Sequence, residues 1–185
     1  MNAVVETRQP QAHRATLEPV QYLTFMLAGE TFAIGILAIK EIIEYSHLTE
    51  VPMMPACVRG VINLRGAVVP VMDLLARFGR TPSAVTKRTC IVIVELEAGG
   101  ERQIVGVVVD AVNEVLDIAA ADIEPAPAFG ARIRGDFIQG MGKVKGKFVI
   151  LLNVAHVLSI DEISSLGDVD ALAVPEGHMA LPAPQ

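Results

Sequence analysis

The chain has little of what nucleic-acid-binding and disulfide-stabilised proteins need. Its 185 residues include no tryptophan, only 4 % aromatic residues and a formal net charge of −6. A nucleic-acid-binding face needs concentrated positive charge, and single-strand binding needs aromatic rings on which bases stack. The two cysteines, Cys57 and Cys90, form neither a disulfide framework nor a Cys-x-x-Cys metal motif. We therefore expect no nucleic-acid partner and no cysteine metal site.

The sequence also lacks a hydrophobic segment long enough to cross a membrane. Its longest apolar run, with glycine admitted, covers only residues 32–39, whereas a spanning helix needs about 18 residues or more. No basic segment followed by an apolar core opens the chain, so we expect no signal peptide and a cytoplasmic location. Apolar residues nevertheless make up 52 % of the chain, so the surplus must be buried in the fold or against a partner.

One stretch of the chain is present twice. Residues 60–78, GVINLRGAVVPVMDLLARF, align without a gap with residues 140–158, GMGKVKGKFVILLNVAHVL. Residues 32–44 likewise match residues 105–117. The residue types at equivalent positions predict turn glycines and helix caps, namely Gly60 with Gly140, Gly66 with Gly146, and Asp73 with Asn153. The repetition predicts two similar, packed β-subdomains.

Turn signals between apolar segments define the expected strands. Two hairpins are predicted, one turning at Gly29 and Glu30 and one at Gly99 and Gly100, because β-prone apolar segments flank each turn. Many short strands, closely spaced turns and few helices predict a mostly-β fold with small barrels. Pro70 lacks a backbone donor, so we expect its strand to lie at a sheet edge or to be bulged.

No set of residues occurs at catalytic spacing. The chain contains no Gly-x-Ser-x-Gly, His-Glu-x-x-His, P-loop or Gly-x-Gly-x-x-Gly motif. His156, in the apolar segment VAHVL, has no serine, cysteine or carboxylate at motif spacing and is interpreted as a packed or half-exposed helix residue. We therefore predict that the protein is not an enzyme.

Two charged residues are notable because each lies in an apolar segment. Glu41 and Arg65 recur in type in the repeat, as Glu114 and Lys145. As solvated groups beside turns they would contribute ~0–1 kcal/mol as a surface pair. Alternatively, they flank an apolar groove and orient a partner, as charged rim groups do. We favour the second interpretation because surplus apolar surface without a catalytic set indicates a binding protein.

Four segments of the chain are informative together, namely YLTFMLAGETFAIGILAIKEIIEY, VPMMPACVRGVINLRGAVVPVMDLLARF, IVGVVVDAVNEVL and EPAPAF. Through them the chain resembles the CheW family, the bacterial chemotaxis scaffolds that couple the histidine kinase CheA to chemoreceptors. The resemblance extends from residue 21 to about 166, which is nearly all of the part of the chain expected to be ordered. The resemblance implies two five-stranded SH3-like β-barrels packed on a shared hydrophobic core, with short helices and a C-terminal helix. It also implies that the protein has no enzymatic activity and no cofactor.

The same resemblance implies two protein partners. A CheA-like histidine kinase would bind through its regulatory domain, and the cytoplasmic tip of a methyl-accepting chemoreceptor would dock into an apolar groove between the barrels. The residues that match this receptor-binding groove are Ile39, Glu41, Arg65 and Val109. Physically this is a helix in a groove, with apolar anchors and a charged rim. The protein would meet the membrane only indirectly, at receptor arrays on its inner face.

Composition and resemblance together set the expected boundaries. We expect a disordered tail at residues 1–18, a first barrel at 19–83, a second barrel at 84–158, a C-terminal helix at 159–166 and a disordered tail at 167–185. Two alternatives stay open. One is a CheW-like adaptor of a non-flagellar chemosensory pathway, such as twitching motility, and the other is a small-molecule-binding β-barrel.

Overall fold

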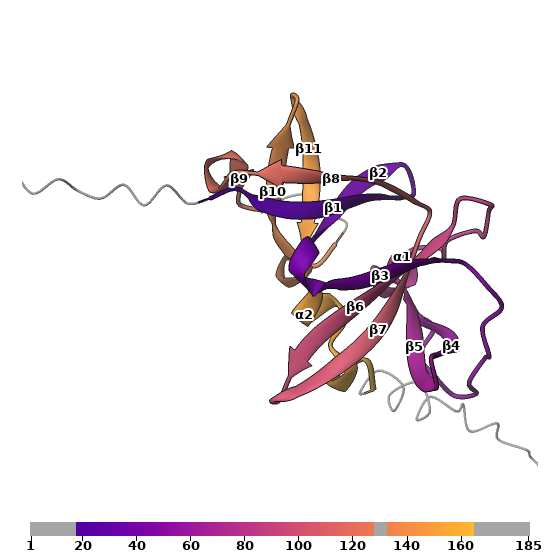
Figure 1. Cartoon of the computed structure of the whole chain (residues 1–185). Helices are drawn as coiled ribbons and strands as arrows, with labels where there is room; N and C mark the ends of the chain where they lie inside the picture. Colours follow the sequence, from indigo (N-terminus) through magenta and orange to yellow (C-terminus); the bar gives the residue numbers. More distant parts are fainter. Residues whose placement is uncertain (1–17, 128–132, 165–185) are drawn as a thin grey trace, which may run out of the picture.

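The computed structural model describes residues 18–127 and 133–164, which form two β-sheets joined by short helical segments (Figure 1). The first sheet contains β1 (Val20–Leu27), β2 (Glu30–Gly35), β8 (Ala111–Ile118), β9 (Ile123–Glu124), β10 (Ile138–Val144) and β11 (Lys147–Leu152). The second contains β3 (Ile39–Glu44), β4 (Val58–Leu64), β5 (Ala67–Asp73), β6 (Cys90–Ala98) and β7 (Glu101–Val109). The prediction of a mostly-β fold with two packed subdomains is confirmed.

The helical segments are short. They are η1 (Ile36–Ala38), α1 (Leu74–Arg77), η2 (Ala120–Asp122), η3 (Gly135–Phe137) and α2 (Val154–Val157). Residues 160–164 are also helical and form the terminal segment of the described chain. The two expected tails lie outside the described residues, apart from Glu18, and so do the last two residues of the expected C-terminal helix.

Each sheet takes its strands from both halves of the chain. The strand orders are β8-β1-β2-β11-β10-β9 and β3-β6-β7-β5-β4. In the alignment of the repeat, β8, β10 and β11 correspond to β3, β4 and β5, and β2 corresponds to β7. The hairpin β1–β2 therefore completes the sheet of the second repeat, and the hairpin β6–β7 completes that of the first. The expected division into barrels at 19–83 and 84–158 is wrong, because the two hairpins are exchanged, and β9 gives one sheet a sixth strand.

Each exchanged hairpin joins the sheet of the other repeat through one pair of parallel strands, β2 with β11 and β7 with β5, and these two pairs are equivalent. Leu151 of β11 lies opposite Ala33 of β2, and Val71 of β5 lies opposite Gly106 of β7. The alignment of the repeat relates these two pairs residue by residue. A β-carbon on Gly106 would lie 2.8 Å from Cγ2 of Ile91, so glycine permits the close approach of the strands at this junction.

Pro70 lies in an inner strand, and the bulge of its ladder falls on the neighbouring β4, so the expectation that its strand is an edge or a bulged strand is wrong. Its strand, β5, is flanked by β4 and β7. The residue opposite it on β4, Val61, bonds through both backbone groups to Thr49, at 2.8 and 3.0 Å. Val61 and Pro70 are therefore a non-hydrogen-bonded pair, and the nitrogen of Pro70 points away from β4. Pairing with β7 starts only at Val71, so the missing N–H interrupts neither ladder.

The prediction that the first glycine pair, Gly60 and Gly140, lies in turns is wrong, because both residues lie inside strands at two equivalent β-bulges. The bulge of β4 falls between Val58 and Gly60, and that of β10 falls between Ile138 and Gly140. A β-carbon on Gly60 would lie 2.5 Å from the carbonyl oxygen of Thr49, and the φ of Gly60 is 151°. Bulges of this kind increase the twist of a strand and need a small residue where the backbone approaches closely.

The second glycine pair lies in the hairpin turns, as predicted from residue type. Gly66 and Gly146 have φ values of 88° and 76°, and they follow Arg65 and Lys145, whose φ values are 51° and 50°. Two consecutive positive φ values are typical of the two-residue hairpin turn, for which glycine at the second position is favoured.

The largest apolar cluster lies between the two sheets. It includes Phe25 and Phe32 from the first sheet and Val92 and Val107 from the second, all fully buried. Each sheet also carries a smaller cluster of its own, one around Val71 and Ile93 and one around Tyr22 and Leu151. This shared core takes up part of the apolar surplus seen in the composition, and the sheets cannot separate without exposing it.

Candidate partner-binding site

An open groove lies where the chain passes from the first sheet to the second. It has a volume of about 470 Å³ and is lined by Val20, Gly35, Ile36, Leu37, Ala38, Gln139, Leu152, Asn153, Val154 and Ala155. Within it, η1 connects β2 of one sheet to β3 of the other, and Leu37 of η1 is 96 % exposed. A large apolar side chain exposed beside an apolar hollow is typical of a partner-binding surface. We call this surface the crossover groove.

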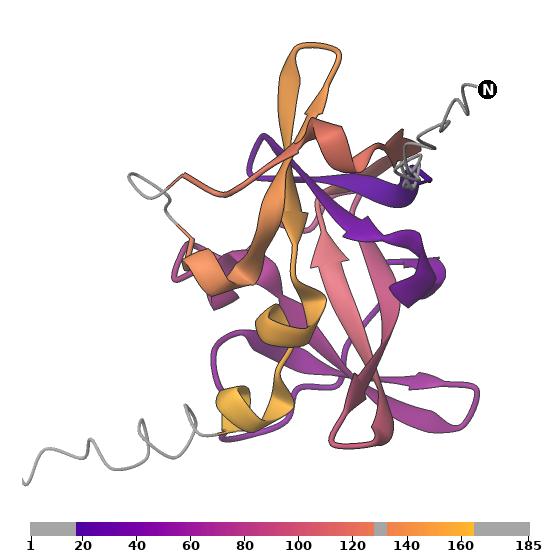
Figure 2. The ribbon, with the colours of Figure 1, turned by 90° about the vertical axis from the view of Figure 1, so that its left-hand side faces the viewer.

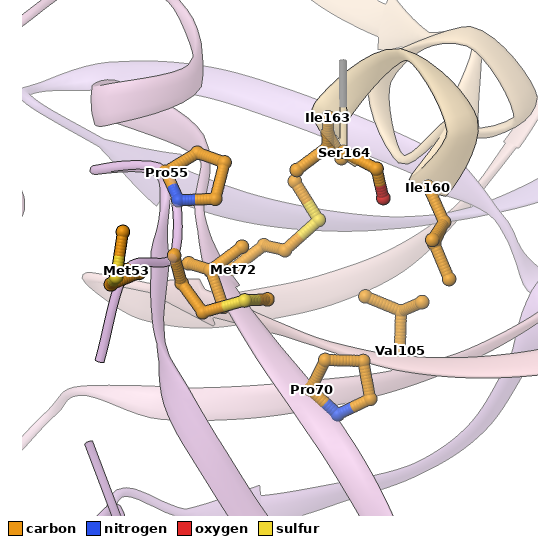
Figure 3. A pocket seen from close by; sticks show the side chains of 10 residues that line it. Met53, Pro55, Pro70, Met72, Val105, Ile160, Ile163 and Ser164 are labelled. Carbon is orange, nitrogen blue, oxygen red and sulfur yellow. The ribbon is translucent and has the colours of Figure 1, made fainter. Parts of the chain in front are cut away.

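A second hollow, the methionine pocket, lies beside the terminal helical segment. It has a volume of about 420 Å³ and is lined by Met53, Met54, Pro55, Val58, Pro70, Met72, Val105, Ile160, Ile163 and Ser164. Figure 3 shows Met53 from the loop before β4, Met72 from β5, and Ile160 and Ile163 from the terminal helix around one space. Methionine side chains are flexible and polarisable, which suits them to apolar partners of varied shape.

The predicted groove residues Ile39 and Glu41 point to opposite faces of β3. A bulge separates them, because Ile39 lies opposite Val94 and Glu41 lies opposite the adjacent residue Ile93. Cross-strand partners share a face of the sheet, whereas adjacent residues of a strand do not. Ile39 therefore packs on the cluster between the sheets, while Glu41 lies on the face that carries the second sheet's own cluster.

Glu41 and Arg65 form a bidentate ion pair at the surface. Nη1 and Nη2 of Arg65 donate to the two carboxylate oxygens of Glu41, each at 2.9 Å. The side chain of Arg65 is 77 % exposed and that of Glu41 24 %. The equivalent residues Glu114 and Lys145 form no ion pair within the described ranges. The pair therefore distinguishes the second sheet from the first.

Val109 does not lie with the other predicted groove residues. It is fully buried in the cluster between the sheets. Its neighbour across the strands is Cys90, which in turn lies opposite Glu44, at the far end of β3 from Ile39. Val109 therefore supports the core and presents no surface to a partner. Of the four predicted residues, the structure brings together Glu41 and Arg65.

Sequence analysis missed Arg59, the partner of the capping residue Asp73. The carboxylate of Asp73 is fully buried and accepts hydrogen bonds from Nε of Arg59 at 2.9 Å, from the backbone N–H of Ser83 at 2.9 Å and from that of Ala76 at 3.1 Å. Arg59 also donates to the carbonyl oxygen of Ser83. This network ties the loop after α1 to β4 and β5, and three of its members lie far apart in the sequence.

The second repeat has a neutral version of the same arrangement. The alignment places Gln139 at the position of Arg59 and Asn153 at that of Asp73. Asn153 caps α2, accepting a hydrogen bond from the backbone N–H of His156 at 3.4 Å, as Asp73 caps α1. The difference in charge between the two pairs was the sequence signal that could have revealed the role of Arg59.

A cluster of charged groups holds the terminal helix, residues 160–164, which lines one side of the methionine pocket. Glu162 pairs with Nη2 of Arg77 at 3.2 Å and with Arg134, and Arg134 also pairs with Asp136 at 2.5 Å. The guanidinium carbons of Arg77 and Arg134 lie 4.7 and 4.6 Å from the centre of the Phe137 ring. The hydrogen bond from Arg134 holds the pKa of both Glu162 and Asp136 below the usual carboxyl range.

Metal-binding clusters are absent from the described part of the chain. No group of three or more His, Cys, Asp or Glu residues there could hold a metal ion. Burial raises the pKa of the Cys57 thiol, which favours its uncharged form. Residues 18–127 and 133–164 also include no helix of the length and apolarity that a membrane crossing requires. The crossover groove, the methionine pocket and the Glu41–Arg65 ion pair are surface features of the kind found in the adaptor class, here on a two-sheet β-module.

Comparison with known proteins identifies the family to which the chain belongs. The profile of the CheW-like domain matches residues 21–162, and the chain belongs to the CheW family. The chemotaxis protein CheW of Klebsiella aerogenes is 32 % identical over 149 residues, which cover 80 % of this chain and 87 % of that protein. CheW of Bacillus subtilis is 37 % identical over 144 residues, which cover 77 % of this chain and 89 % of that protein.

A solved structure supports the same assignment. The crystal structure of the scaffolding protein TtCheW from Thermoanaerobacter tengcongensis superposes with a TM-score of 0.68 at 34 % identity. The match covers 78 % of this chain and 91 % of that chain. The fold and the family predicted from the sequence are confirmed.

Proposed function

We propose that the protein is a non-enzymatic adaptor that couples a CheA-like histidine kinase to the cytoplasmic tips of methyl-accepting chemoreceptors. The observation that carries this proposal is the presence of two separate apolar hollows, the crossover groove and the methionine pocket, in a member of the CheW family. An adaptor holds two partners at once and therefore needs surfaces that do not overlap. In this role the protein lies in the cytoplasm, at receptor arrays on the inner face of the membrane.

We assign the receptor tip to the crossover groove. The tip is helical, and a helix binds by laying its apolar side chains into a groove of this kind. Leu37 and Val20, 96 % and 48 % exposed, supply apolar contacts on the open side of the groove. Ile39, two residues after Leu37, packs on the apolar cluster between the sheets. The next part of β3 carries Glu41, which is held by its ion pair with Arg65. Glu41 and Arg65 thus do not line the groove, and their role is to hold in place the strand that follows it.

The test uses the full chain, a receptor cytoplasmic fragment and the regulatory domain of the kinase. Leu37→Asp places a charge in the groove, so we expect gel filtration to show loss of co-elution with the receptor fragment and retention of co-elution with the kinase domain. Val85→Asp is the matched control, because Val85 is an exposed apolar residue, 52 % accessible, that lines neither hollow.

Three outcomes would contradict the proposal. The wild-type protein could bind neither partner, which would leave a CheW-like fold that serves another purpose. Leu37→Asp could retain the receptor fragment in full, which would place the receptor elsewhere. Val85→Asp could lose the receptor as completely as Leu37→Asp, which would show that the effect does not depend on the groove.

A further inference from the structure

We propose that the tip of the β10–β11 hairpin is a docking site for an acidic segment of a partner protein that also carries an apolar side chain. The tip consists of residues 143–148, KVKGKF, and we call it the basic hairpin. Figure 2 shows the hairpin projecting from the top of the molecule, away from the rest of the first sheet. The inference does not depend on which partners the crossover groove and the methionine pocket take.

Positive charge is concentrated in this hairpin. The chain has five lysines, and three of them are Lys143, Lys145 and Lys147. Residues 137–160 contain no aspartate or glutamate, although the net charge of the chain is −6. The fold does not require these lysines, because the equivalent positions of the β4–β5 hairpin hold Asn63, Arg65 and Ala67.

The three lysines have no carboxylate partners within the described ranges. None of the ion pairs there includes them. By contrast, Lys40 pairs with Glu95 at 2.6 Å and Arg65 pairs with Glu41. Among residues 18–127 and 133–164, no carboxylate therefore occupies the ammonium groups of the basic hairpin, which leaves them open to an acidic partner.

The tip is a ribbon whose two edges are open. β10 pairs with β9 only at Met141 and Gly142, and β11 pairs with β2 only at Ile150 and Leu151. Beyond these contacts, the backbone of residues 143–149 pairs only within the hairpin, while Val144 and Val149 pack on the first sheet's own apolar cluster. Lysines on open strand edges also discourage pairing between chains. That protective role accounts for the charge but not for the neighbouring aromatic residue.

Phe148 is the feature that points to a partner. Its side chain is 51 % exposed, and it lies directly opposite Lys143 across the hairpin. Because cross-strand partners share a face, the ring and the ammonium group of Lys143 are side by side on one surface. Aromatic residues are enriched in protein interfaces, where an apolar group of the partner covers the ring and a charged rim steers the encounter.

The chemistry of the basic hairpin favours an acidic protein segment over other polyanions. Nucleic acid requires a larger basic face than three lysines, and the negative charge of the remaining surface repels it. A stable membrane anchor needs more apolar and basic residues than one phenylalanine and three lysines provide. A peptide with carboxylates around one apolar side chain matches both the charge and the ring.

The experiment selects peptides on the full chain. A random dodecapeptide library is selected on immobilised wild-type protein and counter-selected on the variant Lys143→Gln/Lys145→Gln/Lys147→Gln. We expect the surviving peptides to be enriched in aspartate and glutamate around an apolar residue. Their affinity, measured by fluorescence anisotropy, should fall about tenfold or more between about 50 and 300 mM salt, since rim charges are screened.

Variants then locate the binding site. The triple lysine variant should lose at least about tenfold in affinity, and Phe148→Ala about fivefold, if carboxylates and an apolar contact act together. The control is Lys40→Gln/Lys87→Gln, which changes the two remaining lysines and should leave the affinity unaltered. Thermal melting checks that each variant is folded.

Several results would overturn the inference. One is a selected set without acidic enrichment, and another is equal affinity of a folded triple variant. A loss in the control variant as large as in the triple variant would show a bulk charge effect. Lysine-dependent sedimentation of the full chain with phosphatidylserine vesicles, not competed by acidic peptides, would make the surface a lipid site instead.

Discussion

At the scale of single residues, the two helix caps meet the same need in different ways. Both α1 and α2 need an acceptor for their first turn, which Asp73 and Asn153 provide. Asp73 is a buried charge and is accompanied by Arg59, whereas the neutral Asn153 needs no counter-ion. A buried ion pair contributes little net stability, but loss of one member leaves the other uncompensated.

Asp73→Asn tests this dependence. The asparagine keeps the cap but leaves the guanidinium of Arg59 without its carboxylate, so we expect the free energy of unfolding to fall by about 3 kcal/mol. Arg59→Gln/Asp73→Asn recreates the neutral pair of the second repeat and should recover more than half of that loss. Urea denaturation measures both, and a double variant less stable than the single one would contradict the explanation.

Arg65→Ala tests the exposed pair. Because the side chain of Arg65 is 77 % exposed, the free energy of unfolding should change by less than ~1 kcal/mol. Receptor affinity, measured by titration with the cytoplasmic fragment, should nevertheless fall several-fold, because Arg65 holds Glu41 and the strand that continues from the crossover groove. Arg102→Ala, an arginine of similar exposure at 79 % that lies in neither hollow, is the control. Unchanged receptor affinity in folded Arg65→Ala would disprove this role.

Residue type alone predicted the local roles but not the distant partners. Asp73 and Asn153 were identifiable as caps, and Gly66 and Gly146 as turn residues, because each role depends on a few adjacent residues. Arg59 and Ser83 were not, since their contact with Asp73 depends on how a loop returns to the sheet. Val109 was misplaced for the same reason. The position of a residue in a family motif does not determine whether its side chain faces the core or a partner.

At the scale of elements, the terminal helix depends on the ionisation of two carboxylates. Hydrogen bonds from Arg134 lower the pKa of Glu162 and Asp136 in the folded protein. A carboxyl with a lowered folded pKa stabilises the fold at pH above its unfolded pKa, and this contribution is lost as the pH falls through the folded pKa. The docking of the helix should therefore weaken in acid.

Glu162→Gln tests this acid sensitivity. We expect the melting temperature of the wild type to fall more steeply than that of Glu162→Gln as the pH is lowered from about 6 to about 3, because the variant has already lost the titrating group. Glu50→Gln, which removes an exposed carboxylate outside this cluster, is the control for the loss of one negative charge. Parallel pH profiles for wild type and Glu162→Gln would exclude Glu162 as a determinant of helix docking.

The bulge glycines offer a comparison between the repeats. Gly60→Ala would place a β-carbon 2.5 Å from a backbone oxygen at a φ of 151°, and the backbone cannot easily yield. Gly140→Ala would place one 2.6 Å from Cγ2 of Ile123, a side chain that can move, and 3.0 Å from the carbonyl oxygen of Glu124, a looser backbone contact than that of Gly60. We expect losses of roughly 3 kcal/mol or more for Gly60→Ala and about 1–2 kcal/mol for Gly140→Ala in urea denaturation. The reverse order would contradict this assignment.

Strand periodicity predicted which segments form strands, but it did not predict correctly, for every residue, on which face of the sheet the side chain lies. Ile39 and Glu41 are two residues apart, which in a regular strand places them on one face. The bulge between them reverses that relation. Pro70 likewise sits in an inner strand, because its nitrogen falls where neither neighbour needs a donor. Both outcomes depend on pairing with another strand, which the sequence of one strand does not contain.

At the scale of the whole molecule, the repeat predicted two similar subdomains without revealing the exchange of hairpins. The alignment shows which strands are equivalent, but a hairpin makes the same contacts whether it pairs within its own half or with the other half. The linkers and the packing of the shared core decide between these arrangements. The division at residues 83 and 84 was therefore predicted from continuity of sequence, and the sheets do not follow it.

Separation of the two halves tests the exchange. Residues 18–83 and 84–164, produced separately, each lack the hairpin that completes their sheet, so we expect circular dichroism and melting to show no cooperative fold for either half alone. When the two are mixed, the native fold should return, because all strand pairs can form again. A cooperatively folded single half would show that the hairpins can pair within their own repeat.

The exchange of equivalent hairpins between two copies of a repeat is the arrangement of a domain-swapped dimer, here joined into one chain. A symmetric ancestor of this kind would have presented every surface twice. In a single chain, by contrast, each copy can differ from the other. One copy now carries the Glu41–Arg65 pair and the other carries three lysines and an exposed phenylalanine. Covalent linkage thus allows two halves of similar structure to present unlike surfaces.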